Sequence, residues 1–250
     1  HPRIGATDVC PMIPVANVTK DECVILSDEL GKDVGEKLGI PVYLYENTAR
    51  SAERRNLENI RKGEYEGLEQ KLKDWIPDYG PAEYNEKVRK SGATVIGSRF
   101  FLIAYNVNLN TRDVSIANEI AKKVRESGSM IADGTGVKKR VPGLLKCVKA
   151  IGVELNEYNI TQVSLNLTNY KETSMHEVFE SIKAQAREHG IEATGSEVIG
   201  LVPKEALREA GAFYTGNSSE ANLIGAAMKH LGLSQLNTFE PEKKIIENLL

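Results

Sequence analysis

Apolar residues recur at three- and four-residue intervals in three stretches of the chain, which is the pattern of an amphipathic helix. The first stretch, 20–38, follows the capping box Thr19-Lys20-Asp21-Glu22, and the second covers 111–127. The third begins at a second capping box, Ser174-Met175-His176-Glu177, and runs to residue 189. A charged stretch over 50–62 ends at Gly63, a helix stop signal, and predicts a further helix.

Shorter stretches that alternate between apolar and polar residues, or run apolar, predict strands. They cover 42–45, 100–109, 144–155, 161–167 and 192–202. A Gly- and Lys-rich stretch, 128–142, predicts a loop. The stretch 64–91 is rich in Tyr, Pro, Gly and charge, and it predicts short helices and loops.

The predicted elements of the second half follow the order β-α-β-β-α-β, which is typical of a ferredoxin-like domain. The first half contains only part of such a unit. We therefore expect an α+β protein with two ferredoxin-like subdomains, 1–98 and 99–250, of which the first lacks its opening elements. A ferredoxin-like sheet that lacks a strand exposes an unpaired edge. We expect ligands to bind between the subdomains, since domain interfaces favour binding clefts.

Composition and charge argue against several classes of partner. The chain has 250 residues and a formal net charge of -3, which gives no indication of nucleic-acid binding. It contains no apolar run long enough to predict a membrane span, and its start does not resemble a signal peptide. Cys10, Cys23 and Cys147 are odd in number and widely spaced, which predicts buried free thiols in a cytoplasmic protein and no metal site.

Several motifs occur in an order that carries more information than any one of them. They are His1-Pro2-Arg3-Ile4-Gly5-Ala6-Thr7-Asp8-Val9, Ile60-Arg61-Lys62-Gly63-Glu64-Tyr65-Glu66, Pro77-Asp78-Tyr79-Gly80-Pro81, Phe101–Leu109, Val163–Thr168 and Gly200-Leu201-Val202-Pro203. Together they resemble the formiminotransferase domain, which also forms the front half of a bifunctional formiminotransferase-cyclodeaminase. Relative to that family the chain begins late, since a segment that normally precedes the His-Pro-Arg motif is absent.

The resemblance implies a folate-dependent transferase. It would move a formimino group from N-formimino-L-glutamate to N5 of tetrahydrofolate, giving 5-formiminotetrahydrofolate and L-glutamate in histidine degradation. The catalytic base of the family falls on His1, and an imidazole suits this role because its pKa lies near the working pH. His176, His189 and His230 fall in predicted helices, where we expect surface residues.

Two alternatives to this function stay open at the level of sequence. One is formyl transfer, between formylglutamate or 5-formyltetrahydrofolate and folate, on the same site. The other is a folate-binding module without catalysis. The expected partners are the small-molecule substrates formiminoglutamate and tetrahydrofolate, a second copy in a homodimer and a cyclodeaminase.

The resemblance also assigns binding residues. The folate-binding stretch of the family resembles residues 80–94, and Arg99 follows at the junction of the halves, where a bidentate carboxylate contact and a plain surface position are both open. Asn106 and Asn108 share one face of their predicted strand, which indicates either a ligand-facing surface or buried hydrogen bonding. The expected folate contacts are Gly80, Pro81, Lys90, Gly92, Ala93, Thr94 and Arg99, and the expected substrate contacts are Arg3, Asn106 and Asn108.

Overall fold

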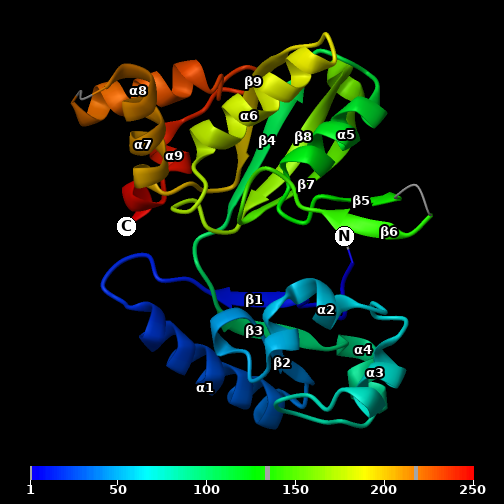
Figure 1. Ribbon diagram of the computed structural model, residues 1–250. Coiled ribbons are helices and arrows are strands. Elements are labelled where there is room, and N and C mark those ends of the chain that lie inside the picture. The colour runs from blue at the N-terminus through cyan, green and yellow to red at the C-terminus, as the bar shows by residue number, and fades with distance from the viewer. Residues whose placement is uncertain (1, 133–135, 217–218) are drawn as a thin grey trace. The chain divides into compact units, whose positions relative to one another are not determined.

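The computed structural model describes residues 2–132, 136–216 and 219–250 of a mixed α/β protein (Figure 1). The chain divides into two compact units, unit 1 (His1–Phe100) and unit 2 (Phe101–Leu250). Among the described residues, no helix is long and apolar enough to cross a membrane.

Unit 1 contains a three-stranded parallel sheet. Its strands are β1 (Val9–Met12), β2 (Val42–Leu44) and β3 (Thr94–Ser98), and β3 lies between the other two. Val95 is the register partner of Val9 on one side and of Tyr43 on the other. Because helix α1 (Lys20–Leu38) connects β1 to β2, the chain crosses over β3 and returns parallel, as a βαβ connection requires.

Helix α1 has the bounds that its sequence predicts. The Thr19 hydroxyl accepts a hydrogen bond from the Glu22 amide at 3.2 Å, the Glu22 carboxylate accepts one from the Thr19 amide at 2.7 Å, and Gly39 ends the helix in the left-handed region. Small residues form the face that packs on the sheet, so the helix approaches it closely; they are Cys23, Ser27, Gly31 and Gly35. Of the three free cysteines, Cys23 is buried, whereas Cys10 and Cys147 are only half-buried, which corrects the expectation for those two.

Short helices connect β2 to β3. They are η1 (Glu46–Thr48), η2 (Ala52–Arg55), α2 (Leu57–Arg61), α3 (Leu68–Asp74) and α4 (Glu86–Ser91). The continuous helix expected over 50–62 is wrong, because Asn56 is extended (φ -89°, ψ 117°) and separates η2 from α2. The Asn56 side chain caps α2 by accepting a hydrogen bond from the Glu58 amide, so the break begins a new helix.

Unit 2 contains a four-stranded antiparallel sheet. Its strands are β4 (Ile103–Leu109), β7 (Val148–Leu155), β8 (Ile160–Leu167) and β9 (Ala193–Ile199), arranged in the order β7-β8-β4-β9. Helices α5 (Val114–Val124) and α6 (Met175–Glu188) cover one face of this sheet (Figure 1). The other helices of unit 2 in the described part of the chain are η3 (Asn156–Tyr158) and, towards the C-terminus, α7 (Lys204–Thr215), α8 (Glu220–His230), α9 (Pro241–Lys244) and η4 (Ile246–Leu249).

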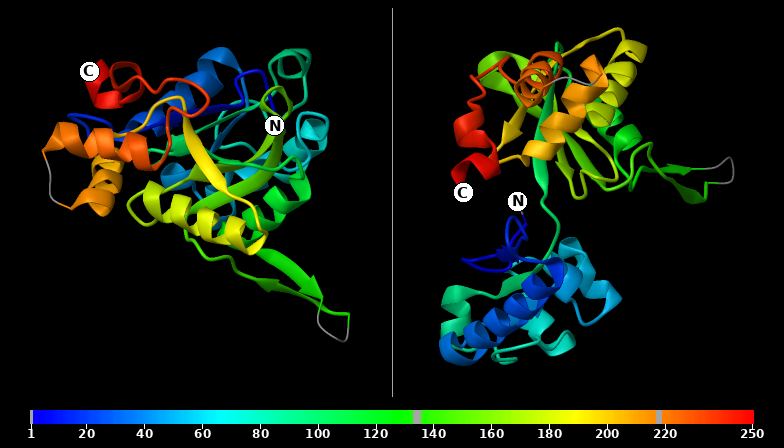
Figure 2. Two further views of the ribbon diagram at one scale, coloured as in Figure 1. Left: turned by 90° about the horizontal axis from the view of Figure 1, so that it is seen from above. Right: turned by 90° about the vertical axis from the view of Figure 1, so that its left-hand side faces the viewer.

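A β-hairpin occupies much of the stretch that was expected to be a loop. Strands β5 (Ser129–Ala132) and β6 (Lys138–Val141) pair antiparallel, with Met130 opposite Arg140. The hairpin extends away from the rest of unit 2 (Figure 2), and nearly all of its described residues are exposed. Residues 133–135 lie outside the described part of the chain.

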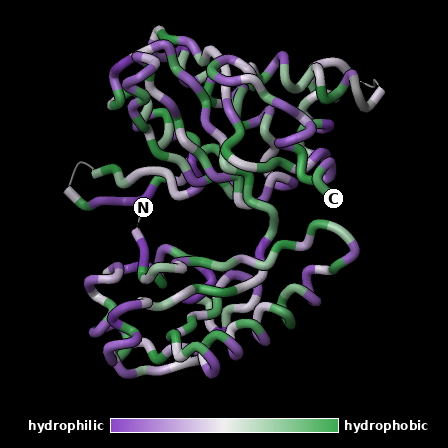
Figure 3. The backbone as a smooth tube through the Cα atoms, turned by 180° about the vertical axis from the view of Figure 1, so that it is seen from behind, coloured by the Kyte–Doolittle hydropathy of each residue, from purple (hydrophilic) through white to green (hydrophobic). Residues whose placement is uncertain are grey.

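Each unit has its own apolar core. In unit 2 a single cluster joins alternate positions of the sheet, such as Tyr105 and Val107, to helix residues such as Ile120 and Ile182. Unit 1 has a larger cluster around Tyr43 and Val95 and a smaller one around Val42, Leu44 and Ile96, the latter beneath α1. Hydrophobic and hydrophilic residues alternate along the helices, as expected for helices with one buried face (Figure 3).

Candidate active site

The chain that follows the His-Pro-Arg motif pairs with the residues just before β3. His1 itself lies outside the described residues, and Pro2 and Arg3 are exposed. Ile4 and Gly5 are buried. The Ala93 amide donates a hydrogen bond to the Ile4 carbonyl at 2.9 Å, and the Ala6 amide donates one to the Ser91 carbonyl at 2.9 Å. The structure thus brings the motif together with the predicted folate contacts Gly92 and Ala93.

Two glycines make this close approach possible. Gly5 and Gly92 form an isolated antiparallel bridge, and Gly92 has a φ of 68°. A Cβ atom on Gly5 would overlap the Ala93 carbonyl oxygen, and one on Gly92 would overlap the backbone of Gly5. Gly92, which was expected to contact folate, therefore makes a close backbone-to-backbone contact with the motif.

An ion pair reaches the same loop from helix α2. The Asp8 carboxylate accepts a hydrogen bond from the Ile4 amide at 2.9 Å through Oδ1, and its Oδ2 accepts one from Nη2 of Arg61. The two side chains are 18% and 21% exposed, so water reaches the pair only in part. Asp8 and Arg61 both fall within the motifs named above, but the sequence alone indicated no role for either of them.

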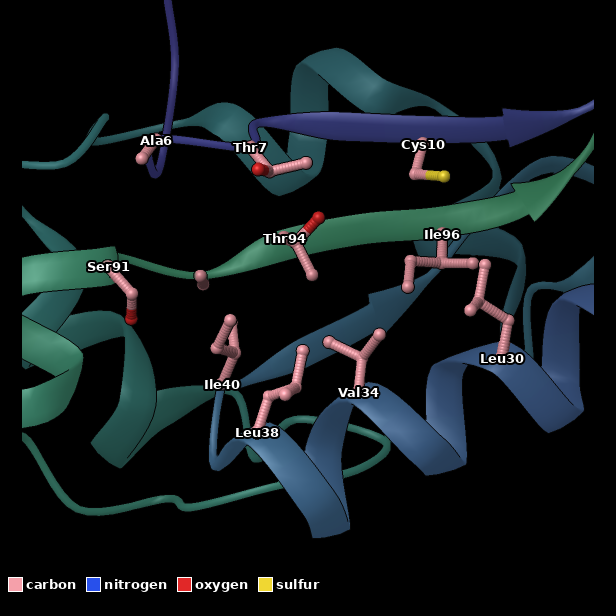
Figure 4. Close-up of a pocket in the computed structure, with 11 residues that line it drawn as sticks. Ala6, Thr7, Cys10, Leu30, Val34, Leu38, Ile40, Ser91, Thr94 and Ile96 are labelled. Carbon is pink, nitrogen blue, oxygen red and sulfur yellow. The ribbon is translucent and has the colours of Figure 1, made fainter.

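A mainly apolar cavity of about 340 Å³ lies between α1 and the sheet of unit 1 (Figure 4). Ala6 and Thr7 of the motif line it together with the predicted folate contacts Ala93 and Thr94. The Thr94 side chain is buried, and its hydroxyl has no hydrogen-bond partner among the described residues. Such a hydroxyl is able to bond to a ligand or to water, and without a partner it carries a desolvation cost. The rest of the lining comes from Cys10, Leu30, Val34, Leu38, Ile40, Ser91 and Ile96.

The other predicted folate contacts of the 80–94 stretch lie at separate places in unit 1. Gly80 (φ 82°) packs against Gly35 of α1 and the Ile40 carbonyl, and Pro81 follows it half-buried. Lys90 is exposed on α4, where its ammonium lies 3.4 Å from the Glu86 carboxylate. An exposed lysine of this kind is free to move towards an anionic group, because a surface ion pair of this type is weak.

Arg99 follows β3 and lies beside Tyr45. Its amide donates a hydrogen bond to the Met12 carbonyl at 3.1 Å, and its Nη1 donates one to the Phe100 carbonyl at 2.8 Å. Burial raises the pKa of Tyr45, and the nearby Arg99 guanidinium opposes that rise. The guanidinium is therefore partly engaged within the chain and keeps further donors for a carboxylate.

In unit 2 the two predicted asparagines belong to a polar network on the sheet face opposite α5 and α6. Nδ2 of Asn106 donates to Oε1 of Glu197 at 3.2 Å. Nε2 of Gln162 donates to the same Oε1 at 2.8 Å and to Oδ1 of Asn108 at 2.7 Å. Nδ2 of Asn108 donates to Oε1 of Gln235 at 2.7 Å, and a Cβ atom on Gly195 would overlap that Gln235 side chain.

The sequence left two interpretations open for these asparagines, a ligand-facing surface or buried hydrogen bonding, and the structure gives a different answer for each. Asn108 is fully buried and hydrogen-bonded, whereas Asn106 and Glu197 are half-buried. Oε2 of Glu197 accepts no hydrogen bond from a described residue, so this half-buried carboxylate is able to accept one from a ligand. The sequence pattern was able to indicate Gln162 as a member of this polar face, because it occupies a polar position in the alternating stretch 161–167.

The three remaining histidines lie in unit 2. His176 is half-buried and stacks on Phe213 with ring centroids 4.4 Å apart, and burial lowers its pKa. His230 is exposed and stacks on Tyr214, and His189 is half-buried at the C-cap of α6. The surface position expected from the sequence therefore holds fully for His230 and in part for the other two.

Comparison with known proteins assigns both units to one family. The family model described as the formiminotransferase domain, N-terminal subdomain, matches residues 1–99, and that of the formiminotransferase domain matches residues 104–250. The chain is 46% identical over 258 residues to formimidoyltransferase-cyclodeaminase of Dictyostelium discoideum and 44% identical over 258 residues to that of Sus scrofa.

These matches cover the whole chain but only part of the relatives. The chain spans 46% of the Dictyostelium discoideum protein and 45% of the Sus scrofa protein, about half of each. It is also 40% identical over 252 residues to glutamate formimidoyltransferase of Streptococcus pyogenes serotype M1, covering 100% of this chain and 72% of the relative. The chain therefore belongs to the formiminotransferase domain family.

Proposed function

We propose that this chain carries a formimidoyltransferase activity that moves a formimino group from N-formimino-L-glutamate to N5 of tetrahydrofolate. The products are 5-formiminotetrahydrofolate and L-glutamate, as in histidine degradation. The observation that carries the proposal is the match of both subdomain models, supported by a relative named glutamate formimidoyltransferase at 40% identity over 252 residues.

The chemistry of this transfer requires proton movement and alignment. N5 of the folate attacks the amidine carbon to give a tetrahedral intermediate, in which the attacking nitrogen loses a proton and the leaving nitrogen gains one. We assign both proton steps to His1, because one imidazole is able to act as base and then as acid near neutral pH. The rest of the acceleration comes from holding the two substrates together.

Replacement of His1 tests this assignment. In the intact protein, His1→Ala is expected to lower kcat by about 10²–10⁴-fold, because general acid–base catalysis contributes about that much. The measurement is steady-state transfer from formiminoglutamate to tetrahydrofolate, with circular dichroism to check folding. His230→Ala is the matched control, since that imidazole is exposed in unit 2 and is expected to leave kcat unchanged. A near-normal kcat in His1→Ala would show that another group moves the proton.

The same assay separates the proposed donor from its rival. Formiminoglutamate and formylglutamate are compared at equal concentrations with tetrahydrofolate as acceptor. We expect turnover with the formimino donor. Turnover with the formyl donor alone would move the activity to formyl transfer, and folate binding without turnover of either donor would leave a binding module.

We assign tetrahydrofolate, as co-substrate, to unit 1 residues Gly80, Pro81, Lys90, Gly92, Ala93, Thr94 and Arg99. Three observations support the assignment: the unpartnered buried hydroxyl of Thr94, the exposed ammonium of Lys90 and the spare donors of Arg99. Cationic side chains suit the anionic glutamate tail of a folate. We assign the glutamate substrate to Arg3 and Asn106, with the exposed Arg3 guanidinium suited to a carboxylate. The expected contact from Asn108 is not retained, because that side chain is fully buried and hydrogen-bonded to Gln162 and Gln235.

We further infer a ferredoxin-like fold for unit 2, since its element order β-α-β-β-α-β accompanies an antiparallel sheet ordered β7-β8-β4-β9. We infer that unit 1 is only a partial relative of that fold. Its strand β3 lies between the two strands that α1 connects, as in a split βαβ unit, but it runs parallel to both of them. We also propose a cytoplasmic homodimer. A cyclodeaminase partner is favoured by the names of the Dictyostelium discoideum and Sus scrofa relatives.

A further inference from the structure

We propose that Asp8 and Arg61 form a positioning pair that holds the loop after the His-Pro-Arg motif in the conformation needed for transfer. The inference rests on the proposed function, because the motif carries the residue assigned to proton transfer. In this proposal neither residue contacts the substrate. Their role is to fix the backbone from which the motif extends.

Asp8 connects the loop to the sheet through both its backbone and its side chain. Its carbonyl accepts a hydrogen bond from the Val95 amide of β3 at 3.0 Å, which anchors residue 8 to the central strand. Its carboxylate Oδ1 accepts a hydrogen bond from the Ile4 amide at 2.9 Å. The carboxylate therefore closes residues 4–8 into a small ring, so Ile4 is held relative to β3.

Arg61 fixes the orientation of that carboxylate from a distant part of the chain. Its Nη2 donates to Oδ2 of Asp8, so one carboxylate oxygen serves the Ile4 amide and the other serves the guanidinium. Arg61 is the last residue of α2, and the preceding Ile60 is fully buried in the unit 1 core. The guanidinium is thus presented from a packed element, 53 residues from Asp8 along the chain.

The pair is better suited to orientation than to stability. Nε of Arg61 is buried without a hydrogen-bond partner among the described residues, which costs free energy. Replacing a part-buried ion pair with apolar side chains is often neutral or stabilising, so such a pair is weak grounds for inferring stability. We therefore attribute the ion pair to positioning of the loop, since its unsatisfied Nε donor makes it a poor source of stability.

The position of the loop matters because catalytic geometry tolerates little displacement. Ile4 and Gly5 already lie against Ala93 and Gly92, and the bonds from Asp8 act on the same few residues. Misplacement of a reacting group by about 1 Å is enough to cost on the order of 10²-fold in rate. Loss of the pair is therefore expected to reduce kcat while the residues that bind substrate remain in place.

The test compares Asp8→Asn, Arg61→Met and Arg61→Lys with the double variant Asp8→Asn/Arg61→Met in the intact protein. We expect each of the first two to lower kcat by about 10–100-fold, with KM for both substrates changed by less than about 3-fold. The shape of the pH profile stays the same, because His1 still moves the proton. Arg61→Lys keeps the charge and restores part of the rate, and the double variant is no slower than the slower single variant.

A second measurement follows the loop itself and does not depend on turnover. Hydrogen exchange at the Ile4 amide is expected to accelerate by about 10-fold or more in Asp8→Ala, which removes the acceptor, and by less in Arg61→Met. Lys123→Gln is the control, because it breaks an exposed ion pair with Glu188 in unit 2 and leaves both measurements unchanged.

The outcomes separate this inference from the proposed function. If the unmodified protein transfers no formimino group, the proposed function fails, and the exchange at Ile4 still decides whether the pair holds the loop. If the unmodified protein is active, the positioning role is overturned by normal kcat in folded Asp8→Asn and Arg61→Met. Losses that multiply in the double variant, or Ile4 exchange that is unchanged in Asp8→Ala, also overturn it.

Discussion

Thr94 combines two properties that rarely occur together, burial and an unpartnered hydroxyl. It begins β3, it faces a mainly apolar cavity, and its neighbours Gly92 and Ala93 contact the His-Pro-Arg loop. Sequence pointed to this residue only through a family resemblance, because a threonine at a strand start has no chemical signature of its own. The missing hydrogen bond became visible only with the surrounding atoms.

Replacement of Thr94 by valine tests whether the hydroxyl meets folate. Valine keeps the shape, so the expected change is the loss of one hydrogen bond, about 0.5–1.5 kcal/mol, or a rise in tetrahydrofolate Kd of about 2–12-fold by calorimetry. Thr161→Val is the matched control, because its buried hydroxyl is also unpartnered but lies in unit 2. A Kd unchanged in Thr94→Val would show that this hydroxyl makes no hydrogen bond to folate.

For individual residues, periodicity predicted which face of a strand a side chain lies on, but not its hydrogen-bond partners. The two-residue period of a strand placed Asn106 and Asn108 on one face, and their shared network confirms it. The partners Glu197 and Gln235 come from positions far along the chain, and pairing across strands is not encoded in local spacing. The same reason hid the pair of Asp8 and Arg61, which lie 53 residues apart.

Among the secondary-structure elements, those that bury one face were predicted best. Helix α1 has the bounds that its capping box and apolar spacing indicated, and the four sheet strands of unit 2 and helices α5 and α6 follow the expected order. The hairpin of β5 and β6 was missed because its strands are stabilised by each other and almost entirely exposed, so no apolar period marks them. The helix expected over 50–62 failed at Asn56, whose side chain favours a cap over a helix interior.

Helix α1 offers a prediction that sets local propensity against packing. Alanine is favoured over glycine inside a helix by about 1 kcal/mol. A Cβ atom on Gly35, however, would lie 2.6 Å from the Gly80 nitrogen and from Cβ of Tyr79. We therefore expect Gly35→Ala to destabilise the protein by about 1–3 kcal/mol, since overpacking forces backbone shifts. The displaced Gly80 and Pro81 should also raise the Kd for tetrahydrofolate.

The matched variant is Gly225→Ala in α8, where an added Cβ atom meets no described atom within 4 Å apart from the backbone of its own helix. There only propensity changes, so we expect stabilisation of about 0.5–1 kcal/mol. Urea unfolding of both variants measures the difference. Stabilisation by Gly35→Ala would mean that α1 is able to withdraw from Gly80 at little cost.

For the molecule as a whole, the two units differ in how their cores are built. The apolar core of unit 2 is one continuous cluster. It joins the sheet to helices from α5 to α8 and extends to Ile245 near the C-terminus. The core of unit 1 is divided into two smaller clusters, and its strand β1 lies at the edge of a three-stranded sheet. From the order of elements we expected only that the first half lacks part of a ferredoxin-like unit, and the division of its core was not predicted. The parallel pairing in unit 1, by contrast, depends on strand direction, which an element order does not specify.

This difference predicts unequal autonomy when the halves are expressed separately. We expect residues 100–250 to fold alone, because their core and antiparallel sheet are self-contained, and to unfold in one cooperative thermal transition. We expect residues 1–98 alone to aggregate or to be protease-sensitive, because a divided core and an unpaired strand edge leave apolar surface and backbone groups exposed. Circular dichroism melts and gel filtration of both fragments measure this. A monomeric 1–98 fragment with a cooperative melt would contradict this prediction. It would show that the two apolar clusters stabilise the fragment enough to fold alone, despite the unpaired edge of β1.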